Sequence, residues 1–188
     1  CGEKMADREA VLAEVMASQP EAVFVPPYDH AEIIAGQGTA AFELLEEVGD
    51  LDQLWVPVGG GGLAAGTTIV ANGQIDVICA EPELARDAHD SLAMGDLQPA
   101  MPPHTVADGL RTALGKLNFE ILRQNRVAVV LVDDEAILRA MRLIWNRLKI
   151  VVEPSAAVCL AAMLLDPQRV AKRAGIILSG GNISPPKP

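Results

Sequence analysis

The sequence has few aromatic residues, few cysteines and a shortage of positive charge. Its 188 residues include three Phe, two Trp and one Tyr, although half of all residues are hydrophobic. The interior must therefore consist of Ala, Val, Leu and Ile, which suits the closely packed layers of an α/β protein. At this length a single domain can bury about 70% of the surface that its unfolded chain exposes.

The shortage of basic residues excludes several classes of partner. The net charge is −10, and no basic run or basic amphipathic helix offsets it. Binding to nucleic-acid phosphates or anionic lipid is therefore not expected. No apolar stretch reaches the roughly 20 residues that span a bilayer, and the first residues lack the order of a signal peptide. We expect a cytoplasmic protein whose partners are small molecules.

The three cysteines are too few and too far apart to suggest a zinc site or a disulfide framework. Cys1, Cys79 and Cys159 form no CxxC pair and have no neighbouring histidine. We predict reduced thiols, with Cys79 at the end of an apolar strand and Cys159 in an Ala-rich helix. Both then pack as small hydrophobic residues.

Apolar strands and helical patterns alternate along the chain, which predicts βα units around a mostly parallel sheet with helices on both faces. Asp29 is expected to cap a turn that leads into a helix, and Glu153 to cap a later helix. Residues 95–118 form a long loop of the kind that often carries function. The expected helices are 5–18, 33–48, 63–72, 84–94, a helix that starts near 133–135, and 156–165; the expected strands are 22–25, 54–58, 75–80, 127–132 and 175–178.

The most informative segment is the run of four glycines, Gly59 to Gly62, between an apolar strand and a helix. Glycines let the backbone close on a ligand, and amide groups at a helix N-terminus bind anions. A nucleoside triphosphate loop is excluded because Leu63 stands where that motif needs a lysine.

Two phosphate ligands remain open from these residues alone. A dinucleotide site fits loosely, since the glycines precede Ala65 and Glu81 ends the next strand. A compact ester such as pyridoxal phosphate also fits, because Ser179 follows another strand and could bond a ring nitrogen at the same edge of the sheet.

Six short motifs together resemble one family. Taken in their order along the chain, they are similar to motifs of the serine/threonine dehydratase and serine racemase family, which is pyridoxal-phosphate dependent and of fold type II. The resemblance covers nearly the whole chain and implies the three-layer large domain of those enzymes. The motifs are Ala35-Gly36-Gln37-Gly38-Thr39, Val56 to Leu63, Ala80-Glu81-Pro82, Ala107-Asp108-Gly109, Glu153-Pro154-Ser155-Ala156 and Leu178-Ser179-Gly180-Gly181-Asn182.

The resemblance assigns roles to particular residues. It implies that the glycines and the amide of Leu63 bind the cofactor phosphate and that Ser179 faces the pyridine nitrogen. It also implies a divalent-cation site, and oxygen ligands of this kind suit Mg²⁺ or Ca²⁺. The residues implied are Gly59, Gly60, Gly61, Gly62, Leu63 and Ser179 for pyridoxal phosphate, and Glu81, the carbonyl of Ala85, and Asp87 for the metal.

One feature of that family is not found. Its members carry the cofactor-linked lysine in a Ser-Phe-Lys-x-Arg-Gly motif in their N-terminal third, and none of the five lysines here lies in such a context. We therefore expect residues 1–27 to be a remnant of the small domain and its linker, and residues 28–188 to be the large phosphate-binding domain. The lysines are Lys4, Lys116, Lys149, Lys172 and Lys187.

Three hypotheses follow for function. The first is the C-terminal portion of a dehydratase or racemase, with no catalytic residue of its own, inactive alone and completed by a separate N-terminal piece. An amino acid is then the substrate of the intact enzyme only. The second is a non-catalytic binding module that assembles into a homo-oligomer, such as a dimer, through apolar surface. The third is a nicotinamide-dependent oxidoreductase that uses the loose dinucleotide fingerprint.

Overall fold

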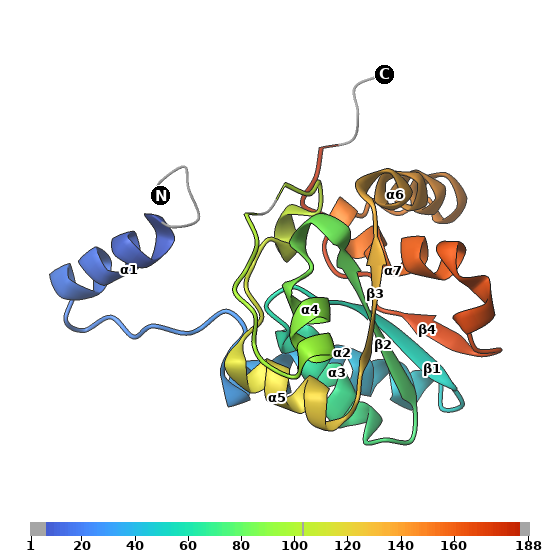
Figure 1. Cartoon of the computed structure of the whole chain (residues 1–188), viewed down its shortest axis with the longest axis horizontal. Helices are drawn as coiled ribbons and strands as arrows, with labels where there is room; N and C mark the ends of the chain where they lie inside the picture. Colours follow the sequence, from blue (N-terminus) through green and yellow to red (C-terminus); the bar gives the residue numbers. More distant parts are fainter. Residues whose placement is uncertain (1–6, 103, 185–188) are drawn as a thin grey trace.

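The computed structural model describes residues 7–102 and 104–184 and contains one four-stranded sheet (Figure 1). All three strand pairs are parallel, and the strand order is β3-β2-β1-β4. The strands are β1 (Gln53–Pro57), β2 (Asp76–Pro82), β3 (Ala128–Val132) and β4 (Ala174–Ile176). The α-helices are α1 (Asp7–Ser18), α2 (Ala31–Glu47), α3 (Gly62–Ala71), α4 (Asp87–Met94), α5 (Lys116–Gln124), α6 (Asp134–Leu148) and α7 (Pro154–Leu165).

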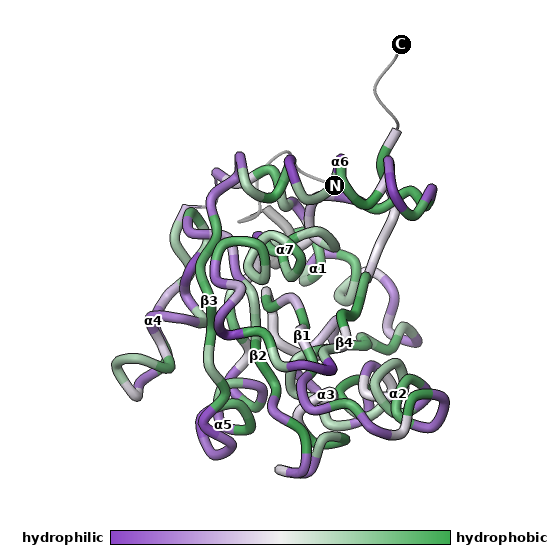
Figure 2. Tube along the Cα trace, turned by 90° about the vertical axis from the view of Figure 1, so that its right-hand side faces the viewer, coloured by the Kyte–Doolittle hydropathy of each residue, from purple (hydrophilic) through white to green (hydrophobic). Residues whose placement is uncertain are grey.

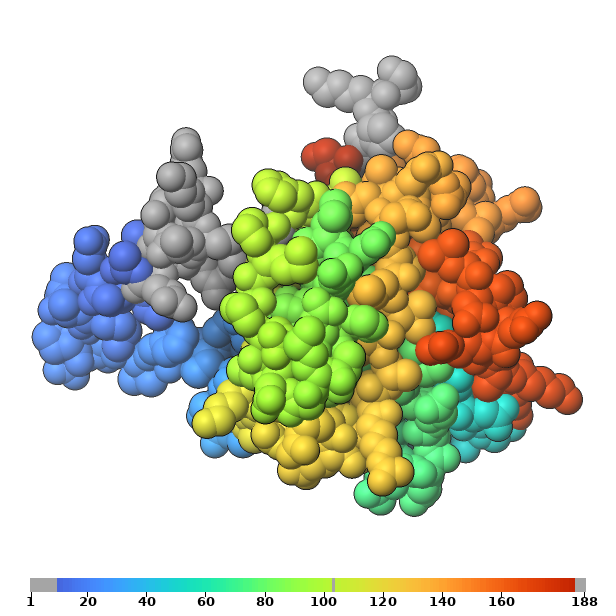
Figure 3. Space-filling model, viewed as in Figure 1, coloured from blue at the N-terminus to red at the C-terminus, as the bar shows by residue number. Residues whose placement is uncertain are grey.

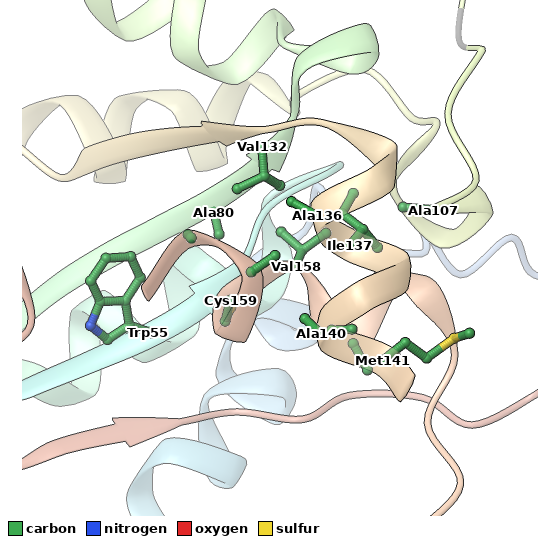
Figure 4. Close-up of a cluster of buried hydrophobic side chains, with 14 of the residues drawn as sticks. Trp55, Ala80, Ala107, Val132, Ala136, Ile137, Ala140, Met141, Val158 and Cys159 are labelled. Atoms are coloured by element: carbon green, nitrogen blue, oxygen red, sulfur yellow. The ribbon is translucent and has the colours of Figure 1, made fainter. Parts of the chain in front are cut away.

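Helices cover both faces of the sheet, so the predicted three-layer α/β architecture is confirmed. Side chains alternate along a strand, and in β1 they reach two different cores. Trp55 packs toward α6 and α7, whereas Val56 packs with α3 and α5. Figure 4 shows the first core, where Val158 of α7 lies beside Ala136 and Ile137 of α6, and Cys159 of α7 lies on the side of Trp55. Burial on both faces explains why all five residues of β1 are buried.

The helix next to the sheet on this side, α7, consists mostly of small residues. Ala156, Ala157, Ala161 and Ala162 are all buried, which brings the helix close to the strands. Cys159 is buried in the same helix and is a free thiol, as is Cys79 in β2. Burial raises the pKa of both thiols. Their predicted role as small hydrophobic residues is confirmed, while Cys1 lies outside the described residues.

Hydropathy follows the same layering. In Figure 2 the central strands are mainly hydrophobic, whereas the outer helices α2 and α5 alternate between hydrophobic and hydrophilic positions. Within residues 7–102 and 104–184 no helix combines the length and the apolar character needed to cross a membrane.

The N-terminal part of the chain departs from the sequence prediction. Helix α1 projects to one side of the body (Figures 1 and 3), and the expected strand 22–25 is not formed. Residues 22–26 have no regular secondary structure, and Val23 is 85% exposed. A strand needs a neighbour for its backbone hydrogen bonds, and the described sheet offers none at this place.

The long segment 95–118 was also predicted incompletely, because α5 begins inside it at Lys116. Acidic side chains from elsewhere hold the segment in place. Asp87 accepts a hydrogen bond from the Leu114 amide at 2.7 Å, and Asp134 accepts bonds from the side chain of Thr105 and the amide of Val106. Segment 95–118 is therefore held by carboxylates as well as by the burial of Ala107, Leu110 and Leu114 in the two cores.

Asp29, the residue predicted to cap the turn before the second helix, does not cap it; His30 does. The ring nitrogen of His30 accepts a hydrogen bond from Glu32 at the start of α2. Asp29 instead accepts hydrogen bonds from the amides of Lys116 and Leu117, at 3.1 and 2.9 Å, and so caps α5. A carboxylate at that position also lies favourably in the field of the helix dipole.

Helices α2 and α3 cross at backbone contact, and this crossing generates a stability prediction. A Cβ atom added at Gly66 would lie 2.5 Å from the carbonyl oxygen of Ile34. We expect Gly66→Ala to lower the free energy of unfolding by about 1–3 kcal/mol, the usual cost of overpacking. Gly36→Ala is the matched control, because Gly36 is exposed in α2 with nothing within 4 Å of an added Cβ.

The control is expected to stabilise the protein by up to about 1 kcal/mol, since alanine is the better helix former. Urea unfolding followed by circular dichroism measures both changes. A Gly66→Ala protein as stable as the wild type would show that the helices do not cross this closely.

Candidate functional site

The glycine loop joins the carboxyl end of β1 to the first turn of α3. Gly61 is the N-cap residue of α3, and it has φ of 91°, in the left-handed region that favours glycine. No side chain caps this helix. The first amides of an α-helix have no partner within the helix, so this end is suited to an anion.

The loop is held from one side by the start of α5. The carbonyl oxygen of Gly60 accepts hydrogen bonds from the side-chain nitrogen of Asn118 at 2.7 Å and from the amide of Gly115 at 3.0 Å. In a trans peptide the C=O and N–H groups point in opposite directions. The amide of Gly61, which shares this peptide with the Gly60 carbonyl, therefore points away from α5.

Neighbouring side chains pack so closely on the loop that they leave no room for a Cβ. A Cβ at Gly60 would lie 2.4 Å from the ring of Tyr28, and one at Gly61 would lie 2.6 Å from the side chain of Leu114. The glycines are thus required by contacts within the protein as well as by backbone conformation.

The loop opens into a cavity of about 370 Å³, which is within the size range of small-molecule sites. All six residues that were predicted to hold the cofactor line this cavity: the five of the glycine loop and Ser179. They meet because β1 and β4 are adjacent parallel strands whose following loops emerge at one edge of the sheet. The lining residues are Pro27, Tyr28, Gln37, Pro57, Gly59, Gly60, Gly61, Gly62, Leu63, Gly109, Leu110, Thr112 and Ser179.

The loop that carries Ser179 is held by Glu153. Its carboxylate accepts a hydrogen bond from the amide of Asn182 at 3.0 Å, and its amide donates to the carbonyl of Gly180. Glu153 is the N-cap residue of α7, as predicted, and its side chain makes no capping bond to that helix. Its side chain is directed instead to the 180–182 turn, where a Cβ at Gly180 would overlap the carboxyl group.

Several residues of the cavity wall were not predicted. Tyr28, Gln37, Leu110 and Thr112 line it, and Asn118 holds the loop from behind. Gln37 belongs to one of the recognisable motifs, but nothing in the local sequence marks the others. Among the described residues, no lysine lines the cavity.

The predicted metal ligands lie elsewhere, at the end of β2 and the start of α4. Both oxygens of the buried Glu81 carboxylate accept backbone hydrogen bonds, from Ala88 at 2.9 Å and His89 at 2.8 Å. Burial raises the pKa of Glu81 to about 8, the two amide bonds oppose this, and the charge of Asp87 adds to it. Burial also raises the pKa of Asp87.

Both carboxylates accept hydrogen bonds from backbone amides, Glu81 from those of Ala88 and His89 and Asp87 from that of Leu114. In residues 7–102 and 104–184 no group of three or more His, Cys, Asp or Glu side chains is arranged to hold a metal ion. The predicted set contains only two carboxylates, with the carbonyl of Ala85 as the third ligand, so it stays a prediction.

The position of Glu81 also bears on the dinucleotide interpretation. That interpretation needs an accessible carboxylate at the end of the second strand to bind a ribose. Glu81 has no exposed surface and both its oxygens are bonded to amides of α4. The carboxylate on which the dinucleotide fingerprint depends is therefore not accessible to a ribose.

This α/β fold, with a glycine loop and a serine at one sheet edge, offers a site for a small phosphate-bearing ligand, and comparison with known proteins identifies the family. Residues 1–180 match the family described as "Pyridoxal-phosphate dependent enzyme", and the chain belongs to that family.

Individual relatives make the comparison more specific. The chain is 43% identical to a serine racemase of Dictyostelium discoideum, over 97% of this chain and 59% of the relative. It is 42% identical to an L-threo-3-hydroxyaspartate ammonia-lyase of Saccharomyces cerevisiae, over 94% of this chain and 56% of that protein. The solved structure of maize serine racemase superposes with a TM-score of 0.90 at 39% identity, over 96% of this chain and 58% of that one. The chain thus spans less than two thirds of these relatives.

The packing around Gly61 predicts how a substitution at this residue changes anion binding. Gly61→Ala would force a Cβ against Leu114 in a left-handed conformation, and the loop would have to move. We expect the affinity for inorganic phosphate to fall by about ten-fold or more, a change of 1.4 kcal/mol. Isothermal titration calorimetry measures this.

Gly73→Ala serves as its control, because Gly73 also has positive φ but nothing lies within 4 Å of an added Cβ. That variant should lose about 1–2 kcal/mol of stability for the left-handed conformation and keep its phosphate affinity. Equal losses of affinity in the two variants would refute a specific role for Gly61.

Proposed function

We propose that this chain is the C-terminal, cofactor-phosphate-binding portion of a serine/threonine dehydratase or serine racemase. The observation that carries the proposal is the meeting of the glycine loop and Ser179 at one cavity. Membership of the pyridoxal-phosphate dependent family supports it, as do relatives named as a serine racemase and a hydroxyaspartate ammonia-lyase.

The residues present suit pyridoxal phosphate. The amides of the glycine loop and the N-terminus of α3 would bind the phosphate, because that helix end has no side-chain cap of its own. The hydroxyl of Ser179 would bond the pyridine nitrogen and leave it largely unprotonated. When bound, the cofactor withdraws electrons from the substrate Cα, which assists loss of a β-hydroxyl group or racemisation.

On this proposal, the described residues do not supply the base for that chemistry. Lys116, Lys149 and Lys172 are described and do not line the cavity, while Lys4 and Lys187 lie outside the described residues. We therefore place the cofactor-linked lysine in polypeptide other than residues 1–188 and expect this chain to be inactive alone.

A covering domain fits the surface of the N-terminal segment. An apolar cavity of about 830 Å³ lies between residues 24–29, Leu12 of α1, and the start of α5. Phe24 and Val25 line it and are 47% and 62% exposed. On this proposal residues 1–27 belong to the small domain and linker, residues 28–188 form the large domain, and the remaining polypeptide covers this surface.

The divalent cation is a further part of the proposal. Mg²⁺ or Ca²⁺ would be held by the carboxylates of Glu81 and Asp87 and the carbonyl oxygen of Ala85, since both ions prefer oxygen ligands. A cation beside these two groups would favour their charged forms and so oppose the effect of burial.

The second candidate function is a non-catalytic assembly module that forms a homo-oligomer such as a dimer. The exposed apolar run Val23, Phe24 and Val25 favours it, because contiguous apolar surface of this kind commonly marks an interface. The two candidates differ in whether activity returns when the rest of the enzyme is supplied.

Recognition of the cofactor ring can be separated from recognition of its phosphate. We expect Ser179→Ala to weaken binding of 4′-deoxypyridoxine 5′-phosphate about three- to ten-fold, the value of one hydrogen bond. This probe lacks the aldehyde, so it cannot react with lysines. Affinity for inorganic phosphate should not change, and Ser184→Ala, at an exposed serine outside the cavity, should alter neither affinity. Equal binding of the probe by wild type and Ser179→Ala would rule out the ring contact.

The overall proposal is tested by complementation. The chain is mixed with pyridoxal phosphate and with the N-terminal segment of a related serine racemase, and pyruvate, 2-oxobutyrate and D-serine are measured from L-serine and L-threonine. We expect activity only in the mixture, and none when the lysine of the added segment is replaced by alanine. Association without activity would favour the assembly module, and turnover by the chain alone would overturn the proposal.

A further inference from the structure

Three consecutive residues before α2 are each tied to the body of the domain. The carbonyl of Pro27 accepts a hydrogen bond from the side chain of Gln37 at 3.0 Å. The carbonyl of Tyr28 accepts one from Asn118 at 3.2 Å, and Asp29 caps α5. The chain therefore enters the domain through a docked segment, residues 27–29.

Asn118 has an unusual place in this arrangement. Its side chain is completely buried, and its single NH₂ group donates to two carbonyls, those of Tyr28 and Gly60. The other polar atom of this side chain, Oδ1, has no hydrogen-bond partner. A buried oxygen without a partner is unfavourable. The presence of an asparagine at this position is therefore better explained by the two hydrogen bonds that it donates than by packing.

The two acceptors belong to adjacent residues of the wall of the same cavity. Gly60 is part of the glycine loop, and the ring of Tyr28 occupies the space where a Cβ of Gly60 would stand. One side-chain nitrogen thus ties the loop to the aromatic wall that packs on it. If either carbonyl shifts, the NH₂ group of Asn118 can no longer donate to both carbonyls at once.

We propose that Asn118 is a positioning residue of the phosphate cradle. It sets the orientation of the Gly60–Gly61 peptide and, through Tyr28, links the loop to the docked segment 27–29 and the linker before it. As far as the ligand is concerned, this inference rests on the proposed function, in which the cavity takes the phosphate monoester of a small aromatic ring.

The geometry predicts a loss of binding that exceeds any loss of folding. Asn118→Leu keeps the approximate shape and removes both donors. We expect its affinity for 4′-deoxypyridoxine 5′-phosphate to fall by about ten-fold or more, since the carbonyls of Gly60 in the loop and of Tyr28 beside it each lose a hydrogen bond. The matched control is Asn125→Leu at the other end of α5, where the side chain is exposed and donates only to the carbonyl of Ile121.

A second measurement keeps the inference testable without any ligand. In ¹H–¹⁵N spectra of the ligand-free protein, Asn118→Leu should shift the amide resonances of Gly60, Gly61 and Tyr28, whereas Asn125→Leu should leave them in place. Asn118→Asp, which puts a carboxylate against two carbonyl oxygens, should shift them further. Circular dichroism and the melting temperature of each variant show whether it is folded.

The outcomes separate the two proposals. Failure of the wild type to bind the probe would refute the cofactor proposal, and the amide shifts would still decide the role of Asn118. Unchanged shifts and unchanged affinity in a folded Asn118→Leu protein would overturn the positioning role. If Asn118→Leu does not fold, Asn118→Ser takes its place and is judged by the same shifts.

Discussion

The anchoring of the Gly60 carbonyl is the interaction on which the site depends. Two donors from the start of α5 hold this oxygen, and the planar peptide then directs the next amide away from them. The same peptide leads into a helix that begins at a glycine and has no side-chain cap. The fold therefore leaves the positive end of α3 available to a ligand and fixes the direction from which an anion must approach.

Buried and partly buried carboxylates organise most of what surrounds this loop. Asp29 caps α5, and Asp87 holds the loop that precedes α5. Glu81 binds the start of α4, and Glu153 holds the turn after Ser179. The excess of acidic residues is thus partly structural. Backbone amides of irregular segments need partners when they are covered, and a carboxylate can accept several such bonds at once. Three of these four acids, Asp29, Asp87 and Glu153, lie 27 or more residues away in the sequence from the amides that they bind.

The features that sequence predicted well are those with local causes. The helices and parallel strands follow from hydrophobic periodicity, and the meeting of the glycine loop with Ser179 follows from the rule that parallel strands end at one edge. Helix α5 was not predicted because Gly115 provides no capping side chain, and the cap comes from Asp29, 87 residues before Lys116. The strand expected at 22–25 failed for the opposite reason, since its local pattern is suitable but no neighbouring strand pairs with it.

By itself, the sequence determined the fold class, the family, the phosphate loop and the serine beside it, because each is written in a short run of residues or in a periodic pattern. Only the tertiary structure decided which side chains hold that loop and form the cavity wall. Tyr28, Asn118 and Glu153 acquire their roles from hydrogen bonds and packing across 29 to 90 residues of chain. A side chain takes the partner that is nearest in space when the chain is folded, and no local pattern records that distance.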